Sequence, residues 1–149
     1  MRIVVQRVVR ASVRVEGEVV GEIGRGLLVL AGIERGDGEA AVRAAAEKLA
    51  TLRVFEDAAG KMNLDCAAVS GAFLVVSQFT LAGSVARGRR PSFDRAALPD
   101  EAAPLVELLV SLLRGRGFEV ATGRFRAHME VSLVNDGPVT LIADFRPGS

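Results

Sequence analysis

The stretch GLLVLAGI, residues 26–33, decides the fold class, because it is an unbroken apolar run closed by the polar segment ERGDG. A run of this length and composition is typical of a strand buried in the middle of a sheet. A second run, FLVVSQFTL at residues 73–81, predicts another buried strand, which ends in polar residues. The fold is therefore expected to be organised around a sheet with buried strands.

Two stretches with helical spacing of apolar residues predict the main helices. Residues 39–52 are alanine-rich with one apolar face, and Asp37 is the expected N-cap. A later series of leucines at the same spacing predicts a second helix, from Pro99 or Asp100 to Arg114.

Further strands complete the expected sheet. They are predicted at residues 3–16, 19–23 and 53–57, and within the segments FEVATGRF (118–125) and MEVSLVNDGPVTLIADF (129–145). No internal repeat or linker divides the chain. Residues 1–149 are therefore interpreted as a single domain of mixed α/β class, with two main helices against an extensive sheet.

Composition narrows the class of protein. The 149 residues are 50% hydrophobic and 25% charged with a net charge of +1, which argues against a strongly electrostatic nucleic-acid binder but not against a local basic patch. A single cysteine, Cys66, excludes an intrachain disulfide and favours a reducing, cytoplasmic setting. Arginines break the apolar N-terminal segment, so it is neither a signal peptide nor a membrane span. The only histidine, His128, is interpreted as a surface residue, and no metal site is expected.

An unusual pair, Gly137-Pro138, interrupts the last apolar segment. Proline has no N–H for a sheet ladder and is confined to edges, strand starts and bulges. Taken alone, the sequence Asn-Asp-Gly favours an ordinary hairpin turn here, because these residues tolerate positive φ.

Two further segments are candidates for a functional site. The segment Ser77–Thr80 lies where the second buried run ends, and it either caps the strand or offers hydroxyls and backbone N–H groups to an oxyanion. Arg87, Arg89 and Arg90 lie in the long loop that follows, and they are either solvated or in contact with phosphate.

Several motifs together resemble one known family. They are MNL (62–64), VVSQFTL (75–81), GRRPSF (88–93) and SLVNDGPVT (132–140), and the opening segment 2–33 is similar as well. The family that they resemble is the D-aminoacyl-tRNA deacylases, also called D-tyrosyl-tRNA deacylases. The resemblance runs nearly end to end, and SQFTL together with NDGPVT in this order is highly specific.

The resemblance implies an enzyme that hydrolyses the ester between a D-amino acid and the terminal ribose of a tRNA, and that also accepts glycine mischarged on tRNA. It implies a cytoplasmic homodimer that acts on the 3′ end of aminoacyl-tRNA, with no cofactor, metal or membrane. It also implies a compact fold in which sheets enclose the two main helices as β/α/β layers.

The resemblance carries over to individual residues. The catalytic pocket is implied to contain Ser77, Gln78, Phe79 and Thr80. The selectivity element is implied to be a Gly-cisPro pair, Gly137 and Pro138, that acts across the dimer interface. Supporting residues are Arg7, which matches the residue that steadies the Gly-Pro loop, and Met129. Candidate tRNA contacts are Arg87, Arg89 and Arg90.

A rigid Gly-Pro element is physically suited to select between enantiomers, whereas the mechanism of hydrolysis stays open. A filter that passes many D-residues needs a rigid wall where an L side chain would go. Hydrolysis could use Thr80 as a nucleophile. Alternatively, backbone N–H groups near Phe79 and Thr80 could bind the oxyanion while a water attacks, and the absence of an identifiable base near Thr80 favours this second mechanism. The alternatives in function are a non-catalytic binder of tRNA ends and a hydrolase of another small ester or amide.

Two positions depart from the family pattern. Ala82-Gly83 follows SQFTL, where relatives often carry a bulkier residue, and Arg126 stands where a glycine is common. Both departures concern the rim of the expected pocket.

Overall fold

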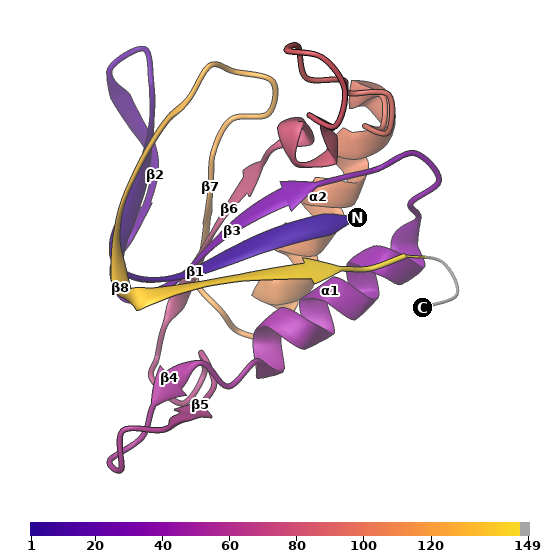
Figure 1. The fold of residues 1–149 in the computed structure, drawn as a ribbon. Coiled ribbons are helices and arrows are strands. Elements are labelled where there is room, and N and C mark those ends of the chain that lie inside the picture. The colour runs from indigo at the N-terminus through magenta and orange to yellow at the C-terminus, as the bar shows by residue number, and fades with distance from the viewer. Residues whose placement is uncertain (147–149) are drawn as a thin grey trace.

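In the computed structural model, residues 1–146 are described, and they form a six-stranded sheet, a two-stranded ribbon and two α-helices (Figure 1). The order in the large sheet is β2-β1-β3-β6-β7, and β8 is added to β1. The expected mixed α/β fold with two main helices is confirmed.

The long first strand, β1 (Arg2–Val15), joins the parts of the large sheet. It pairs with β8 (Glu130–Asp144) along nearly its whole length. On its other edge, its first half pairs with β3 (Gly26–Gly32) and its second half with β2 (Glu18–Ile23). All three pairings are antiparallel.

The sheet curls until its two ends meet. β6 (Ala72–Ser77) and β7 (Val120–Thr122) extend it beyond β3 as parallel neighbours. The opposite end, β2, returns against β7, where a Cβ at Gly21 would lie 2.2 Å from the backbone oxygen of Thr122. Because no side chain fits in that space, glycine is required for the closure.

Each face of the sheet has its own hydrophobic cluster. The inside of the curl is filled by Val8, Val13, Leu28, Leu74 and Val76. The opposite face is covered by α1 (Glu39–Thr51) and α2 (Pro99–Gly115) (Figure 1). Side chains buried between the helices and this face include Ile3, Leu27, Leu49, Phe73, Leu109 and Leu113.

Cys66 belongs to the cluster under the helices and is fully buried. Burial raises the pKa of its thiol to about 12, because the apolar surroundings disfavour the thiolate. The thiol is therefore protonated and unreactive at neutral pH.

A small ribbon projects from the end of the molecule opposite the long loops (Figure 1). It consists of β4 (Phe55–Glu56) and β5 (Met62–Leu64), so the strand predicted at residues 53–57 is shorter than expected. Arg25 stacks over the Phe55 ring at 5.3 Å and joins the ribbon to the sheet.

Two local predictions are wrong. Asp37 does not cap α1, whose N-cap is Gly38 without a side-chain bond. The Asp37 carboxylate instead lies 2.7 Å from the Met1 ammonium and accepts a 2.7 Å bond from the Glu34 N–H. The buried run 73–81 is a strand only to Ser77, after which Phe79–Ala82 forms a 3₁₀ turn, η1.

Candidate active site

The turn that follows β6 is fixed by contacts of its backbone with β3. The Gln78 N–H donates to the Ala31 oxygen at 2.8 Å, and the Leu81 N–H closes the turn onto the Gln78 oxygen at 3.2 Å. A Cβ at Gly32 would lie 2.8 Å from Leu81 Cβ, so a glycine lets η1 pack directly on β3. The turn is therefore held in place by a buried strand.

The side chains of this turn face outward. Gln78 Nε2 donates to Thr80 Oγ1 at 3.1 Å. Phe79 is 57% exposed and meets Phe93 edge to face, with ring centroids 5.2 Å apart. Among residues 1–146, no imidazole or carboxylate hydrogen-bonds to Thr80, and the only contact to its hydroxyl is from the Gln78 amide. Residues 1–146 of one chain therefore supply no base next to this hydroxyl, which a nucleophile would need.

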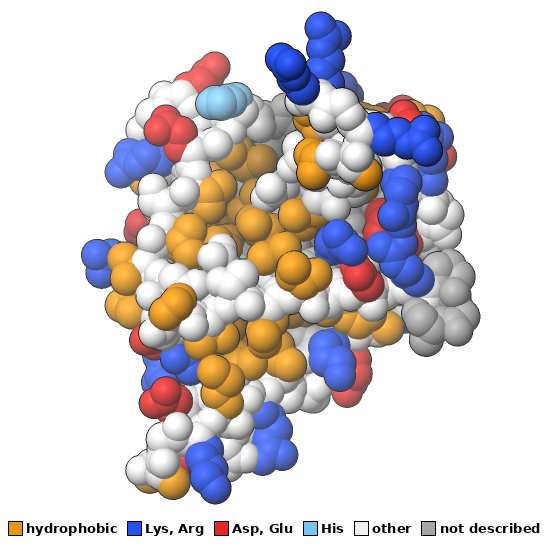
Figure 2. Space-filling model, viewed as in Figure 1, with side chains coloured by type: hydrophobic (Ala, Val, Ile, Leu, Met, Phe, Trp, Pro, Cys, Tyr) orange, Lys and Arg blue, Asp and Glu red, His pale blue; other side chains and the backbone are white. Residues whose placement is uncertain are grey.

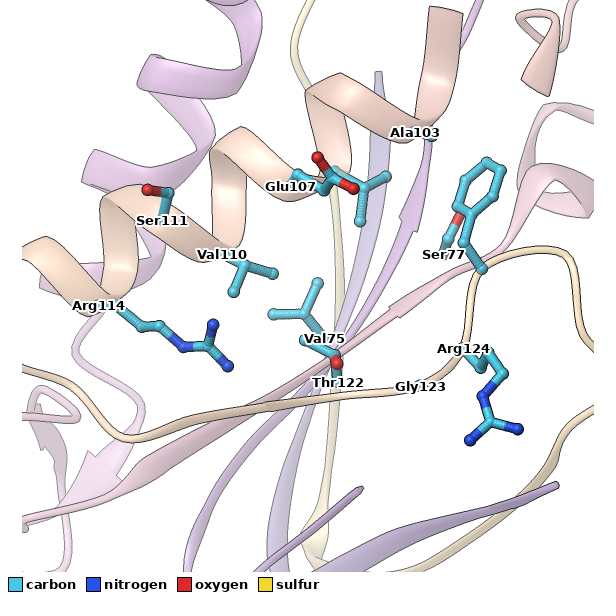
Figure 3. Close-up of a pocket in the computed structure, with 12 residues that line it drawn as sticks. Val75, Ser77, Ala103, Glu107, Val110, Ser111, Arg114, Thr122, Gly123 and Arg124 are labelled. Atoms are coloured by element: carbon cyan, nitrogen blue, oxygen red, sulfur yellow. The ribbon is translucent and has the colours of Figure 1, made fainter. Parts of the chain in front are cut away.

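Ser77 also borders a cavity of about 370 Å³ between α2, β6 and β7 (Figure 3). Its walls include Val75, Val110 and Phe125. Figure 3 shows the side chains of Glu107 and Arg114 extending from α2 toward this space. The cavity therefore combines apolar walls with a few polar groups, a composition typical of small-molecule sites.

Gly137-Pro138 lies in a bulge of a continuous strand, so the hairpin interpretation is wrong. β8 pairs with β1 on both sides of the bulge, with Gln6 opposite Thr140 and Val8 opposite Asn135. Between these pairs, residues 136–139 of β8 face the single residue Arg7 of β1. The peptide bond between Gly137 and Pro138 is cis, as the resemblance implied.

Arg7 holds this bulge from one side. Its side chain is 6% exposed, and Nε donates to the Asp136 oxygen at 2.8 Å while Nη1 donates to the Val54 oxygen at 2.7 Å. A Cβ at Gly137 would lie 3.2 Å from Arg7 Nη2 and 2.8 Å from Val139 Cγ2, and the φ of Gly137 is +146°. The position is therefore closed to other residues by contact and by backbone conformation.

Asn135 holds the bulge from the other side, a role that the sequence interpretation missed. Its Oδ1 accepts the Val139 N–H at 2.7 Å, and its Nδ2 donates to the Val139 oxygen at 3.1 Å and to Thr140 Oγ1 at 3.0 Å. Gln6 Nε2 donates to the same hydroxyl at 3.3 Å. An amide and a hydroxyl flanking a Gly-Pro pair were the available signal, but the sequence interpretation read Asn135 as part of a turn.

One chain does not bring its two signature segments together. The SQFT segment follows β6 and binds Ala31, which pairs with Ile3, whereas the bulge lies opposite Arg7. The two segments are offset by four residues along the strand direction, which is about 13 Å. They are also three strand spacings apart across the sheet, which is about 14 Å. Ser77–Thr80 and Gly137-Pro138 are thus at separate places on the chain.

The other expected site residues are dispersed. Arg87, Arg89 and Arg90 are exposed in the loop between η1 and α2. Met129 packs on Gly123, a residue of the cavity wall, and not on the Gly-Pro bulge. His128 is exposed, as expected.

Within residues 1–146, no group of His, Cys, Asp and Glu side chains could hold a metal ion. None of the helices in this part of the chain is long and apolar enough to cross a membrane.

Comparison with known proteins identifies the class to which this fold and these segments belong. The profile of the family described as D-Tyr-tRNA(Tyr) deacylase matches residues 4–144. A protein of Anaeromyxobacter dehalogenans named D-aminoacyl-tRNA deacylase is 60% identical over 146 residues, which are 98% of this chain and 98% of that protein. A protein of Symbiobacterium thermophilum with the same name is also 60% identical, over 97% of this chain and 95% of its own length.

Solved structures agree. One described as a c-Myc DNA Unwinding Element Binding Protein has a TM-score of 0.90 at 38% identity and covers 97% of this chain and 98% of that one. Another, described as a probable eukaryotic D-amino acid tRNA deacylase, shares the fold with a TM-score of 0.82 at 20% identity, over 95% and 97% of the two chains. The chain belongs to the D-Tyr-tRNA(Tyr) deacylase family, and the resemblance noted from its motifs is confirmed.

Proposed function

We propose that this protein removes D-amino acids, and mischarged glycine, from tRNA by hydrolysing the ester to the terminal ribose. We further propose that each site combines Ser77–Thr80 of one protomer with Gly137-Pro138 of its partner. The observation that carries the proposal is the presence of both segments in a chain 60% identical to a D-aminoacyl-tRNA deacylase over 146 residues.

Stabilisation of an oxyanion by the backbone is the chemistry that the SQFT turn supports. The N–H groups of Phe79 and Thr80 open η1, so they have no acceptor within the turn. Two adjacent N–H groups can bind the oxyanion that develops on the ester carbonyl. A water then attacks the carbonyl carbon, the bond to the ribose oxygen breaks, and that oxygen takes the proton that the water gives up. Thr80 positions the substrate.

A rigid backbone wall is the proposed basis of chiral selection. Arg7 and Asn135 hold the Gly137-Pro138 bulge from two sides, so it cannot yield to a clashing L side chain. Its carbonyl oxygens can accept hydrogen bonds from the α-ammonium group of the substrate. A D side chain then points away from the wall and can vary, and glycine has no side chain to exclude.

Two observations support a two-chain site. The first is the separation of the two segments within one chain. The second is exposed apolar side chains: β8 leaves Val134, Leu141 and Ile142 accessible, the last at 67%, and hydrophobic side chains gather across the middle of the face in Figure 2. A two-fold dimer that buries such a surface could bring each SQFT segment to the partner's bulge.

The cavity beside Ser77 is the proposed place for the terminal nucleoside. The scissile ester is on the ribose of that nucleoside, so its base must lie next to the turn. Apolar walls around Phe125, together with Glu107 and Arg114, suit a flat base with polar edges.

Turnover tests the activity. The protein, at a small fraction of the substrate concentration, is incubated with D-aminoacyl-tRNA, with glycyl-tRNA and with the matched L-aminoacyl-tRNA. Release of many equivalents of D-amino acid and glycine, with the L-substrate intact, is expected. Release of no more than one equivalent would instead indicate a non-catalytic binder of tRNA ends.

Mixed dimers test the shared site. Two inactive variants, one disrupted in Ser77–Thr80 and one carrying Gly137→Glu, are unfolded, mixed and refolded. About half of the dimers are mixed, and in each mixed dimer one pocket collects both lesions and the other neither. About a quarter of wild-type activity should return. Mixed dimers that form but stay inactive would contradict the cross-subunit site.

A further inference from the structure

Two loops at the same end of the molecule carry arginines without partners. The loops are residues 83–98, between η1 and α2, and residues 123–129, between β7 and β8 (Figure 1). Among residues 1–146, the side chains of Arg87, Arg89, Arg90, Arg124 and Arg126 make no hydrogen bond or ion pair, and all five are exposed.

Arginines elsewhere differ from these five. With the exception of Arg10, each is held by an acidic side chain, a carbonyl oxygen or an aromatic ring. Asp94 is the only acidic residue in the two loops, and among the described residues it makes no ion pair with any of the five arginines. The positive charge of these two loops is therefore not neutralised locally, which is the pattern expected where an anion will bind.

The first loop contacts the proposed catalytic turn, and the second borders the cavity beside it. Phe93 of the first loop meets Phe79 of the turn, and a Cβ at Gly83 would lie 2.8 Å from the Phe93 ring. Arg124 of the second loop lies at the cavity that Ser77 borders, with its side chain directed away from α2 (Figure 3). The two groups of arginines therefore flank the place where the ester is proposed to be cleaved.

The backbone conformation of Arg126 also indicates a role for its side chain. Its φ is +65°, in the left-handed region that non-glycine residues seldom occupy. The position suits glycine, yet the chain has a charged side chain that contacts no described partner. Folding alone does not account for an arginine here.

We propose that Arg124 and Arg126 form the second side of a phosphate clamp, opposite Arg87, Arg89 and Arg90, that holds the single-stranded 3′ end of tRNA. The clamp rests on the proposed function, because it needs the terminal ribose at the SQFT turn. The phosphates preceding that ribose then pass between the loops, where guanidinium groups bind them without reading sequence. The clamp would fix the direction in which the strand enters the cavity.

Two double variants of equal charge test the clamp. The test variant is Arg124→Gln with Arg126→Gly, which removes two charges and leaves a residue that tolerates the φ at 126. The control is Arg10→Gln with Lys61→Gln, which removes two exposed charges that have no side-chain partner within residues 1–146 and lie elsewhere. Affinity for deacylated tRNA is measured over a range of salt concentrations.

The test variant should bind tRNA on the order of tenfold more weakly at low salt. The slope of log affinity against log salt concentration should become about 1.4 less steep, because each lost contact with a single-strand phosphate removes about 0.7. The control should keep the wild-type slope. Arg126→Lys should keep both the charge and the slope. Equal slopes for wild type and test variant, or an equal loss in the control, would overturn the clamp.

A phosphate-free substrate separates this inference from the proposed function. On a D-aminoacyl-adenosine, the single variant Arg126→Gly, whose residue does not line the cavity, should keep the wild-type kcat/KM, while its kcat/KM on D-aminoacyl-tRNA falls. If Arg126→Gly loses activity on both substrates, the site itself is damaged, which contradicts the clamp. If wild type hydrolyses neither substrate, the proposed function fails, while the salt slopes still decide whether the arginines bind RNA.

Discussion

The Gly-Pro bulge and the SQFT turn are held in opposite ways. Side chains hold the bulge in place. The buried Arg7 guanidinium and the Asn135 amide together hydrogen-bond to three backbone oxygens and one backbone N–H. The SQFT turn is held by its own backbone against β3, and its side chains are largely free, with Phe79 57% exposed.

The difference matches the roles proposed for the two regions. A wall that rejects one enantiomer must not move, so it needs rigid supports on both sides. A turn that binds a developing charge through N–H groups needs its backbone fixed but not its side chains. Substitutions at the supports should therefore have larger effects than substitutions of the turn's own side chains.

Arg7→Ala should have the largest effect. The carbonyls of Asp136 and Val54 would lose a charged donor, which should cost about 3 kcal/mol of unfolding free energy. Urea denaturation checks this value, and the ratio of D- to L-aminoacyl-tRNA hydrolysis should fall with it. Arg7→Lys keeps the charge but has a single donor group, so its stability and its selectivity should lie between those of wild type and Arg7→Ala. Unchanged stability and selectivity would show that the bulge is rigid without Arg7.

Asn135→Ala should have the second largest effect. It leaves the Val139 N–H and carbonyl without their side-chain partners and should cost about 1–2 kcal/mol. Asn135→Asp retains the acceptor and should restore part of the loss. The sensitive measurement is again D/L selectivity, with Ser132→Ala on the same strand as control. Selectivity as high as that of the control variant would remove Asn135 from the filter.

Thr80→Ala should reduce kcat by less than about tenfold, which corresponds to about 1.4 kcal/mol. The reason is that its hydroxyl is engaged by Gln78 and has no base. Thr80→Ser should be close to wild type in single-turnover rate. A mass adduct of the D-aminoacyl group on Thr80 would establish covalent catalysis and reverse this expectation.

Asp144→Asn should have the smallest effect and gives a baseline for the same strand pair. Arg2 hydrogen-bonds to Asp144 at 2.8 Å and holds the pKa of that carboxyl below its usual value. Because the folded pKa is the lower one, the contribution is present above the unfolded pKa of about 4 and is lost as pH falls through the folded value. The pair is partly exposed, so the change should be under about 1 kcal/mol at pH 7. Urea midpoints of variant and wild type should converge in strong acid, and a gap that persists there would exclude the ion pair as its cause.

Elements with a strong local pattern were predictable. The apolar run at β3 and the leucine spacing of α2 each determine their structure from adjacent residues, and the observed bounds differ by one residue or so. The motifs also single out Ser77–Thr80 and Gly137-Pro138 as the candidate site, which stays a prediction.

What failed depended on partners far away in the sequence. The bulge in β8 replaces a hairpin because Arg7, 129 residues before Asp136, supplies the donor that the ladder lacks there. Asp37 pairs with the Met1 ammonium and not with its own helix. The meeting of β2 and β7 at Gly21 has no local signature either, since any glycine in a strand looks alike in the sequence.

The buried, protonated state of Cys66 has a practical consequence. Because the single native thiol does not react at neutral pH, an engineered cysteine would be the only group in the native protein that takes a maleimide label. Probes placed singly at Ser84 and at Ala127, one on each arginine-bearing loop, would report by fluorescence or spin resonance how each loop responds when tRNA is added. Cys66 does not have to be replaced first, so the hydrophobic cluster under the helices keeps its native packing.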